Sequence, residues 1–85
     1  MKPIRISRHA RFEMRRRGIS AAAVVSTIRA PGQVLPSRKG REIFQSLIGT
    51  AGRLLLRVVV KKDAKAYHVV TAYKTRRVAK YWRTP

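Results

Sequence analysis

Residues 53–61 read Arg-Leu-Leu-Leu-Arg-Val-Val-Val-Lys and form the stretch of the sequence that is richest in Leu and Val. A short apolar run bounded by turn residues predicts a β-strand. Because successive side chains of a strand point to opposite faces of a sheet, one set is expected to face the core and the other to face away. The predicted core set is Leu54, Leu56, Val58 and Val60. The opposite set interleaves the cations Arg53, Arg57 and Lys61 with Leu55 and Val59.

Weaker strand patterns lie on both sides of this strand. They cover residues 33–37, 41–48 and 66–73, and the connections between strands are the short segments 38–40, 49–52 and 62–65. A parallel return needs a dozen or more residues, so strands joined by such short turns are antiparallel. The second half of the chain therefore predicts a three- or four-stranded antiparallel sheet whose uncovered face carries a row of cations.

Two short helices are predicted before these strands. Ser7 is a suitable N-cap for a helix over residues 8–17 that stops at Gly18, and Ser20 is a suitable N-cap for a second helix over 21–29. The pair is expected to form a hairpin at the N-terminus. We expect one α+β domain over residues 1–85, with this two-helix hairpin packed on one face of the antiparallel sheet. The basic tail, 75–82, is expected to be a short helix or an extended arm.

The charge of the chain points to an anionic partner. Lys and Arg total 21 against 3 Asp and Glu, which gives a formal net charge of +18. Such an excess repels itself unless a partner relieves it. A polyanion is the usual partner, because each neutralised phosphate releases condensed counter-ions and arginine grips phosphate with two parallel hydrogen bonds. Nucleic acid is therefore the first expected partner and an acidic protein segment the second, with a membrane surface least favoured.

The composition also excludes several classes of protein. No apolar run approaches the roughly 20 residues of a membrane span, and the first residues lack the apolar segment of a secretory signal. The chain has no cysteine, so it has no disulfide and no zinc–thiolate site. Its three acids and two histidines match no metal-ligand spacing. We expect no metal and no other cofactor, and we expect a cytoplasmic location.

Several groups of residues, in this order along the chain, resemble the small bacterial family called domain of unknown function 4258. They are His9-Ala10 with Met14, Arg17-Gly18-Ile19-Ser20 and Pro31, then Gly40 to Ser46, Leu55 to Val60, and Val70 to Thr75 with Lys80-Tyr81-Trp82. That family is similar to the compact RelE/ParE and BrnT toxins, which implies two helices packed on a small antiparallel sheet. The resemblance further implies a toxin that cuts messenger RNA, often on the ribosome, and that an acidic antitoxin silences.

The expected function is that of a toxin-like RNA-binding protein. The more specific expectation is a metal-independent endoribonuclease. The first alternative is a non-catalytic module that binds nucleic acid or the ribosome. The second is a protein-interaction module that uses its basic face for an acidic peptide.

Cleavage by a 2′-hydroxyl needs a base, an acid and cations that stabilise the phosphorane. His9, in the first turn of the first predicted helix, is a candidate acid–base group, and its alternative role is a structural hydrogen bond to the sheet. RelE-like toxins surround the scissile phosphate with Lys, Arg and Tyr, and the same residue types here are Arg57, Tyr73, Lys80 and Tyr81. The alternative for this set is a solvated basic sheet face with aromatic residues over the edge of the core.

Seven further cations divide into a helix cluster and a sheet-and-tail cluster. The alternative for the helix cluster is stabilisation of the C-terminal end of the helix through its dipole. The expected nucleic-acid-binding residues are Arg15, Arg16, Arg53, Lys61, Lys74, Arg76 and Arg77. Basic residues mixed with aromatic residues suit single-stranded RNA. Trp82 is expected to anchor the tail into the core, and Glu42 to form a structural ion pair with Arg57 or with neighbours of Arg41. Glu13 stands where members of the resembled family often carry a basic residue. It either weakens RNA binding at that position or forms a structural pair with a neighbouring arginine such as Arg17, one helical turn away.

Overall fold

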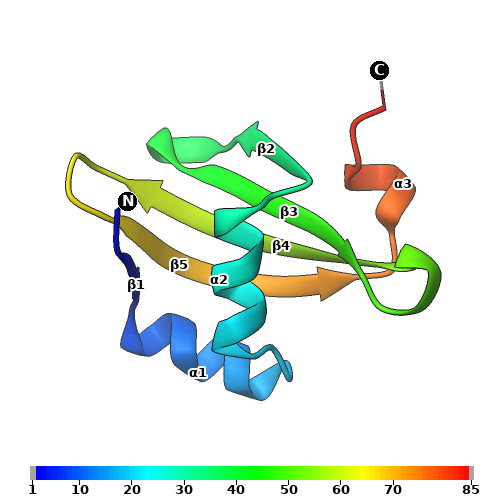
Figure 1. Cartoon of the computed structure of the whole chain (residues 1–85), viewed down its shortest axis with the longest axis horizontal. Coiled ribbons are helices and arrows are strands. Elements are labelled where there is room, and N and C mark those ends of the chain that lie inside the picture. Colours follow the sequence, from blue (N-terminus) through cyan, green and yellow to red (C-terminus); the bar gives the residue numbers. More distant parts are fainter. Residues whose placement is uncertain (1, 85) are drawn as a thin grey trace.

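The structure of the 85-residue chain is a computed structural model that describes residues 2–84. The chain forms three short α-helices and one sheet, and Figure 1 shows how they are arranged. The strands are β1 (Ile4–Ile6), β2 (Gln33–Pro36), β3 (Glu42–Ile48), β4 (Leu54–Lys62) and β5 (Tyr67–Thr75). The helices are α1 (Arg8–Arg16), α2 (Ala21–Arg29) and α3 (Val78–Tyr81), and short 3₁₀ turns lie at Arg38–Gly40 and Thr50–Gly52.

The sheet differs from the prediction in having five strands of mixed direction, in the order β1-β5-β4-β3-β2. Strands β2 to β5 form the expected antiparallel meander. The addition is β1, which pairs parallel to β5 with Ile4 opposite Tyr67 and Ile6 opposite Val69. The prediction of a purely antiparallel sheet was therefore wrong. Three residues are too few to show an alternating pattern, and the partner strand of β1 lies near the other end of the chain.

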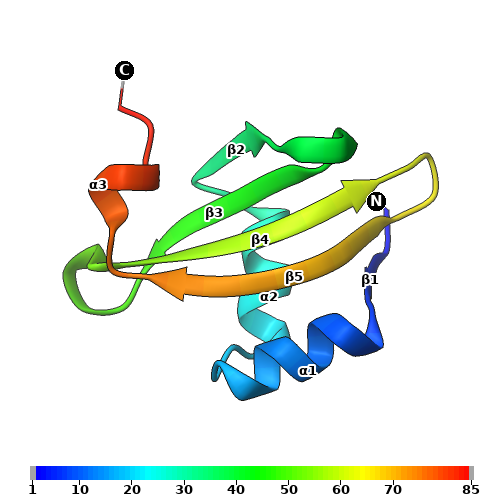
Figure 2. The same cartoon turned by 180° about the vertical axis from the view of Figure 1, so that it is seen from behind.

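The prediction of an N-terminal helix hairpin was also wrong. A strand precedes the helices, and α1 and α2 cross at a wide angle instead of lying antiparallel beside each other (Figures 1 and 2). Both expected caps are present, because the hydroxyls of Ser7 and Ser20 accept hydrogen bonds from the third residue after each of them, Ala10 and Ala23. Between the helices Gly18 has φ +67°, a left-handed conformation that glycine adopts without steric cost. This turn sends α2 across β3 and β4 while α1 packs on β5.

The core lies between these two helices and one face of the sheet. Leu56, Val58 and Val60 belong to it, as the alternation of β4 predicts, and they pack with apolar residues of both helices, Ala10, Met14, Val24 and Ile28. Leu54 is an exception to that prediction. It stands at the first position of β4 and lines a surface pocket instead, because the strand begins beyond the area that the helices cover.

The opposite face of the sheet is partly covered by residues 78–83, hereafter the C-terminal segment. This segment contains α3 and contacts side chains of β2, β3 and β4 that point away from the core. Trp82 packs against Gly32, where a Cβ atom would come within 2.8 Å of the indole ring, so only a glycine leaves room for the ring there. Trp82 therefore holds the tail on the face of the sheet opposite the helices, and the prediction that it anchors the tail into the core was wrong.

Candidate functional site

Four polar residues on the opposite face of the sheet stand directly side by side. Gln33, Gln45, Arg57 and Tyr73 are cross-strand neighbours on β2, β3, β4 and β5. Their side chains are joined in sequence, since the amide nitrogen of Gln45 donates to Gln33 Oε1 over 2.8 Å and Arg57 Nε donates to Gln45 Oε1 over 2.9 Å. Arg57 Nη1 donates to the hydroxyl of Tyr73 over 2.6 Å. We call these four residues the polar row.

The C-terminal segment is bound to this row at several points. The ring of Tyr81 lies over the Arg57 guanidinium, 4.1 Å from its central carbon to the ring centroid, which is a cation–π contact. The amide of Gln45 donates to the Tyr81 carbonyl oxygen over 3.1 Å, and the backbone of Arg83 exchanges hydrogen bonds with Gln33. The side chain of Arg57 is consequently only 6% exposed.

The buried positive charge of Arg57 is stabilised by neutral groups and not by a carboxylate of residues 2–84. Its hydrogen-bond acceptors are an amide and a phenol, its ring contacts are Tyr73 and Tyr81, and no carboxylate of the described residues pairs with it. The expected ion pair between Glu42 and Arg57 is absent among residues 2–84, because Glu42 pairs with Lys62 Nζ at 3.0 Å. A buried charge is costly unless it is paired or fully hydrogen-bonded, so the neutral partners and the aromatic ring together stabilise the guanidinium.

The structure brings together four of the five residues predicted as catalytic. Arg57, Tyr73 and Tyr81 touch, and Lys80 Nζ lies 5.2 Å from the centroid of the Tyr81 ring. His9 lies elsewhere, exposed in the first turn of α1 on the other side of the sheet. The sequence pattern did not reveal Gln45, which is fully buried and connects Arg57 to both Gln33 and the C-terminal segment.

The expected row of exposed cations on this face is not present. Arg57 is buried, Arg53 precedes the strand, and Lys61 is exposed at the far end of β4 opposite His68. The register places half-buried apolar residues between them, with Ile43 of β3 opposite Val59 of β4. An RNA backbone therefore meets no continuous line of cations along this face.

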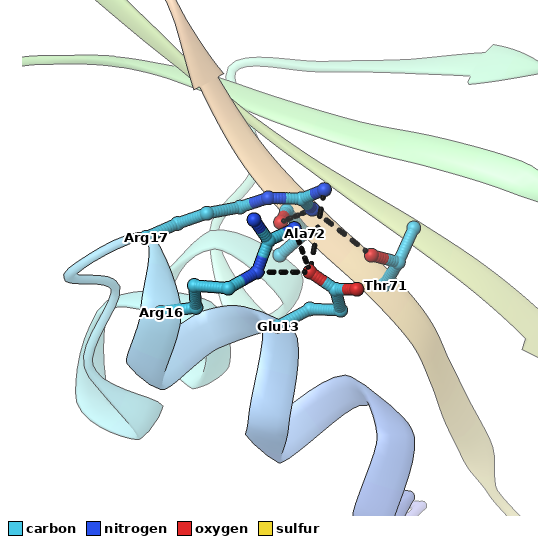
Figure 3. Close-up of polar contacts among 5 residues, drawn as sticks. All are labelled: Glu13, Arg16, Arg17, Thr71 and Ala72. Carbon is cyan, nitrogen blue, oxygen red and sulfur yellow. Dashed lines mark hydrogen bonds and ion pairs between the residues drawn. The ribbon is translucent and has the colours of Figure 1, made fainter.

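The three carboxylate side chains, all among the described residues 2–84, each have a partner. Glu13 contacts Arg16 at 2.7 Å and Arg17 at 3.4 Å, so the structural alternative for Glu13, a pair with Arg17, is the one present (Figure 3). The hydrogen bond from Arg16 lowers the pKa of Glu13. Arg17 also donates to Thr71 Oγ1 and to the carbonyl oxygen of Ala72, which ties the end of α1 to β5 (Figure 3).

Asp63 lies in the turn between β4 and β5. Its Oδ1 accepts hydrogen bonds from the backbone N–H groups of Lys65 and Ala66 at 2.8 and 2.9 Å, and its Oδ2 lies 3.0 Å from Nε2 of His68. These contacts, the backbone ones first, lower the pKa of Asp63 to about 2. With Glu42 on Lys62, no carboxylate of residues 2–84 is free to neutralise further cations.

Six cations, five of which have no carboxylate partner among residues 2–84, lie around the ends of α1 and β5. Lys74 Nζ lies 3.5 Å from the carbonyl oxygen of Gly18, which brings the last turn of α1 beside the end of β5. The turn between β3 and β4 and the link from β5 to α3 meet at this same end of the sheet (Figures 1 and 2). It holds six of the seven residues predicted to bind nucleic acid, which we call the basic end: Arg15, Arg16, Arg53, Lys74, Arg76 and Arg77.

An exposed aromatic residue on α1 was not singled out from the sequence. The side chain of Phe12 is 58% exposed. Arg8 precedes it by one helical turn, and Arg15 and Arg16 follow it at helical spacing, so the ring stands among cations on the helix surface. Its place one turn before Arg15 could have been found from helical periodicity, because Phe12 falls outside the Ala10–Met14 stripe that faces the core.

Comparison with known proteins gives one match. A family model described as Domain of unknown function (DUF4258) matches residues 6–74. The chain belongs to this family. The part that matches the DUF4258 model includes Gln45, Arg57 and Tyr73, whereas the C-terminal segment lies outside it. No curated protein and no solved structure matches the chain, and the similarity to RelE/ParE and BrnT toxins stays a prediction.

Two further findings bear on the kind of site this is. No helix of residues 2–84 is long and apolar enough to cross a membrane. In the same part of the chain, no three His, Asp or Glu side chains come together in a way that could hold a metal ion.

Proposed function

We propose that this protein binds single-stranded RNA through its phosphates at the basic end. The observation that carries the proposal is the charge left unpaired by the fold. Carboxylates of residues 2–84 pair with Arg16, Arg17 and Lys62, and the other 18 of the 21 Lys and Arg side chains have no carboxylate partner there. Phosphate groups would neutralise these cations and release counter-ions, which is the main driving force for binding a polyanion.

Single-stranded RNA is favoured over a duplex by the aromatic residue within this surface. Phe12 is exposed on α1, one helical turn before Arg15 and Arg16, and each base of a single strand offers a face for stacking. In a duplex the bases are stacked on one another, and such a ring has no partner. The proposal therefore joins phosphate contacts at the basic end to base stacking on α1.

The experiment compares two variants that lose the same charge. Arg15→Gln, Lys74→Gln and Arg77→Gln together remove three exposed cations from the basic end. Arg38→Gln, Lys39→Gln and Lys65→Gln remove three exposed cations from the turns at the opposite end of the sheet. Fluorescence anisotropy with a labelled single-stranded RNA should show an affinity loss of roughly 30-fold in the first variant and less than about threefold in the second. Equal losses in both variants would reject the basic end as the binding site.

RNA cleavage is a second candidate function, favoured by one observation: Arg57, Tyr73, Lys80 and Tyr81 converge. In that reaction the 2′-oxygen attacks phosphorus, the P–O5′ bond breaks, and the products are a 2′,3′-cyclic phosphate and a 5′-hydroxyl. Arg57 would stabilise the phosphorane, and a tyrosine hydroxyl would pass the proton from the 2′-oxygen to the 5′-oxygen. Because Arg57 is 6% exposed, this chemistry requires the C-terminal segment to leave the polar row.

Cleavage is tested by incubating end-labelled RNA with the whole chain in the presence of EDTA. The second candidate predicts cyclic-phosphate products that disappear in Tyr73→Phe, and loss of growth when the protein is expressed alone in bacteria. Intact RNA and normal growth would remove the nuclease and leave the binding proposal in place. An acidic partner protein of the antitoxin type stays a prediction.

A further inference from the structure

A pocket of about 680 Å³ opens at the basic end, between the β3–β4 turn and the link from β5 to α3. Thr50, Arg53 and Leu54 line it on one side, and Arg76 and Val78 line it on the other. These two segments lie side by side at one end of the sheet in both views (Figures 1 and 2). The volume is in the range of sites that take small organic ligands, roughly 300 to 1,000 Å³.

The lining combines two chemistries. Leu54 and Val78 supply an apolar surface, and Gly49 and Gly52 of the turn add backbone without side chains. Arg53 and Arg76 supply positive charge, and neither guanidinium has a hydrogen bond or an ion pair with another described residue. No acidic side chain lines the pocket. The site thus suits a ligand with a flat, weakly polar body and an anionic group.

We propose that this pocket holds one nucleotide of the bound RNA, with its base against Leu54 and Val78 and its phosphate between Arg53 and Arg76. The inference rests on the proposed function, because it names a subsite of the basic end. A free metabolite with a flat, weakly polar body and an anionic group would fit the same pocket. The arms of the experiment below distinguish it from RNA.

The pocket also adjoins the polar row through α3. Val78 lines the pocket, and Tyr81, one helical turn later, lies on the Arg57 guanidinium. A nucleotide in the pocket therefore contacts the same short helix that covers Arg57. This arrangement places the RNA strand beside the C-terminal segment, and contact with Arg57 itself would still require that segment to leave the polar row.

The experiment is a titration of isotope-labelled whole protein, followed by NMR, with adenosine 5′-monophosphate, inorganic phosphate and adenosine as separate ligands. The nucleotide should shift the amide signals of Thr50 and Gly52 and the methyl signals of Leu54 and Val78. It should bind about tenfold more tightly than phosphate or adenosine, since only the nucleotide fills both parts of the pocket. Arg53→Gln and Arg76→Gln should each weaken it about tenfold. Arg38→Gln, an exposed arginine in the turn between β2 and β3, should change the affinity less than about twofold.

Each outcome bears on one proposal or the other. If single-stranded RNA binds at the basic end but the mononucleotide causes no shifts at the pocket, the pocket is not a nucleotide subsite and the proposed function stands. If the mononucleotide binds in the pocket but RNA does not bind, the pocket holds a free nucleotide and the RNA proposal fails. Equal affinity for phosphate and for the nucleotide would overturn the proposal that the base binds in the pocket. A loss of nucleotide affinity in Arg38→Gln as large as in Arg53→Gln and Arg76→Gln would overturn the proposal that these two arginines hold the phosphate.

Discussion

On the face of the sheet that α1 and α2 cover, Leu56, Val58 and Val60 pack against apolar helix residues, whereas on the opposite face Gln45, Arg57 and Tyr73 are joined by hydrogen bonds beneath the C-terminal segment. The first group lies on β4 and the second spans β3, β4 and β5, and where both are present, on β4, they are buried to a similar degree. The hydrophobic contacts of the first face are non-directional, and many apolar side chains could supply them. The polar row depends on donors and acceptors that match in position, so it holds only these residue types.

The largest expected effect is on the helix-covered face. Leu56→Ala removes a side chain that is 1% exposed and leaves a cavity in the core. We expect a loss of about 3 kcal/mol in the free energy of unfolding, measured by urea denaturation. Val34→Ala, at a position that is 42% exposed, is the control and should cost less than about 0.5 kcal/mol. A loss below about 1 kcal/mol for Leu56→Ala would show that this face is less tightly packed than its burial indicates.

The next effect concerns the polar row. Gln45→Leu leaves the buried Nε of Arg57 without its acceptor, and we expect a loss of about 2 kcal/mol in the free energy of unfolding. The double variant Gln45→Leu/Arg57→Met removes donor and acceptor together and should be more stable than Gln45→Leu alone, because no buried charge is left unpaired. Arg57→Met alone completes the comparison. If the loss of stability in the double variant equals the sum of the losses in Gln45→Leu and Arg57→Met, the residues of the row act independently.

A smaller effect is expected where the C-terminal segment meets Gly32. Gly32→Ala places a methyl group where the Trp82 ring now lies, and overpacking of this kind costs about 1 kcal/mol. Trp82 is the one tryptophan of the chain, so its fluorescence reports the displacement directly as a shift to longer wavelength. In a Trp82→Leu background the same change should cost less, and an unchanged cost there would place the clash elsewhere.

The smallest effect at neutral pH is expected in the exposed β4–β5 turn, which belongs to neither face. The pKa of Asp63 is lowered from its usual 3.8 to about 2 in the folded protein. Its contribution to stability is therefore fully present above pH 3.8 and is lost as the pH falls toward 2, because the unfolded chain takes up the proton first. Between these pH values, the free energy of unfolding measured by urea denaturation should depend less on pH in Asp63→Asn than in the unmodified protein. The same slope in both proteins would assign the acid sensitivity to other groups.

Local patterns were sufficient for most elements of the fold. Ser7 and Ser20 cap the helices as predicted, and the alternation in β4 placed Leu56 and Val58 in the core. These features depend on neighbours within a few residues. The parallel pairing of β1 with β5 and the crossing of the two helices depend on contacts between distant parts of the chain, and a single sequence carries no local signal for them.

The candidate site was predicted in part for the same reason. Alternation placed Arg57 on the face opposite the core, and residue type singled out Tyr73 and Tyr81. The register of β3 against β4 decides that Gln45 is the partner of Arg57, and the docking of the C-terminal segment decides that Arg57 is buried. The spacing of residues along the chain predicts neither the register of β3 against β4 nor the docking of the C-terminal segment. The expectation of a bare, cationic sheet face was therefore wrong, and the basic end is the surface that we propose for RNA binding instead.

The most direct test of RNA binding at the basic end is the dependence of RNA affinity on salt concentration. For single strands, the slope of log K against log salt changes by about 0.7 for each phosphate contact. Removing Arg15, Lys74 and Arg77 by substitution with Gln should therefore make the slope shallower by about 2, whereas the variant at Arg38, Lys39 and Lys65 should keep the slope of the unmodified protein. An unmodified protein whose affinity is insensitive to salt, or two variants with the same shallow slope, would contradict the proposal that cations of the basic end bind RNA phosphates.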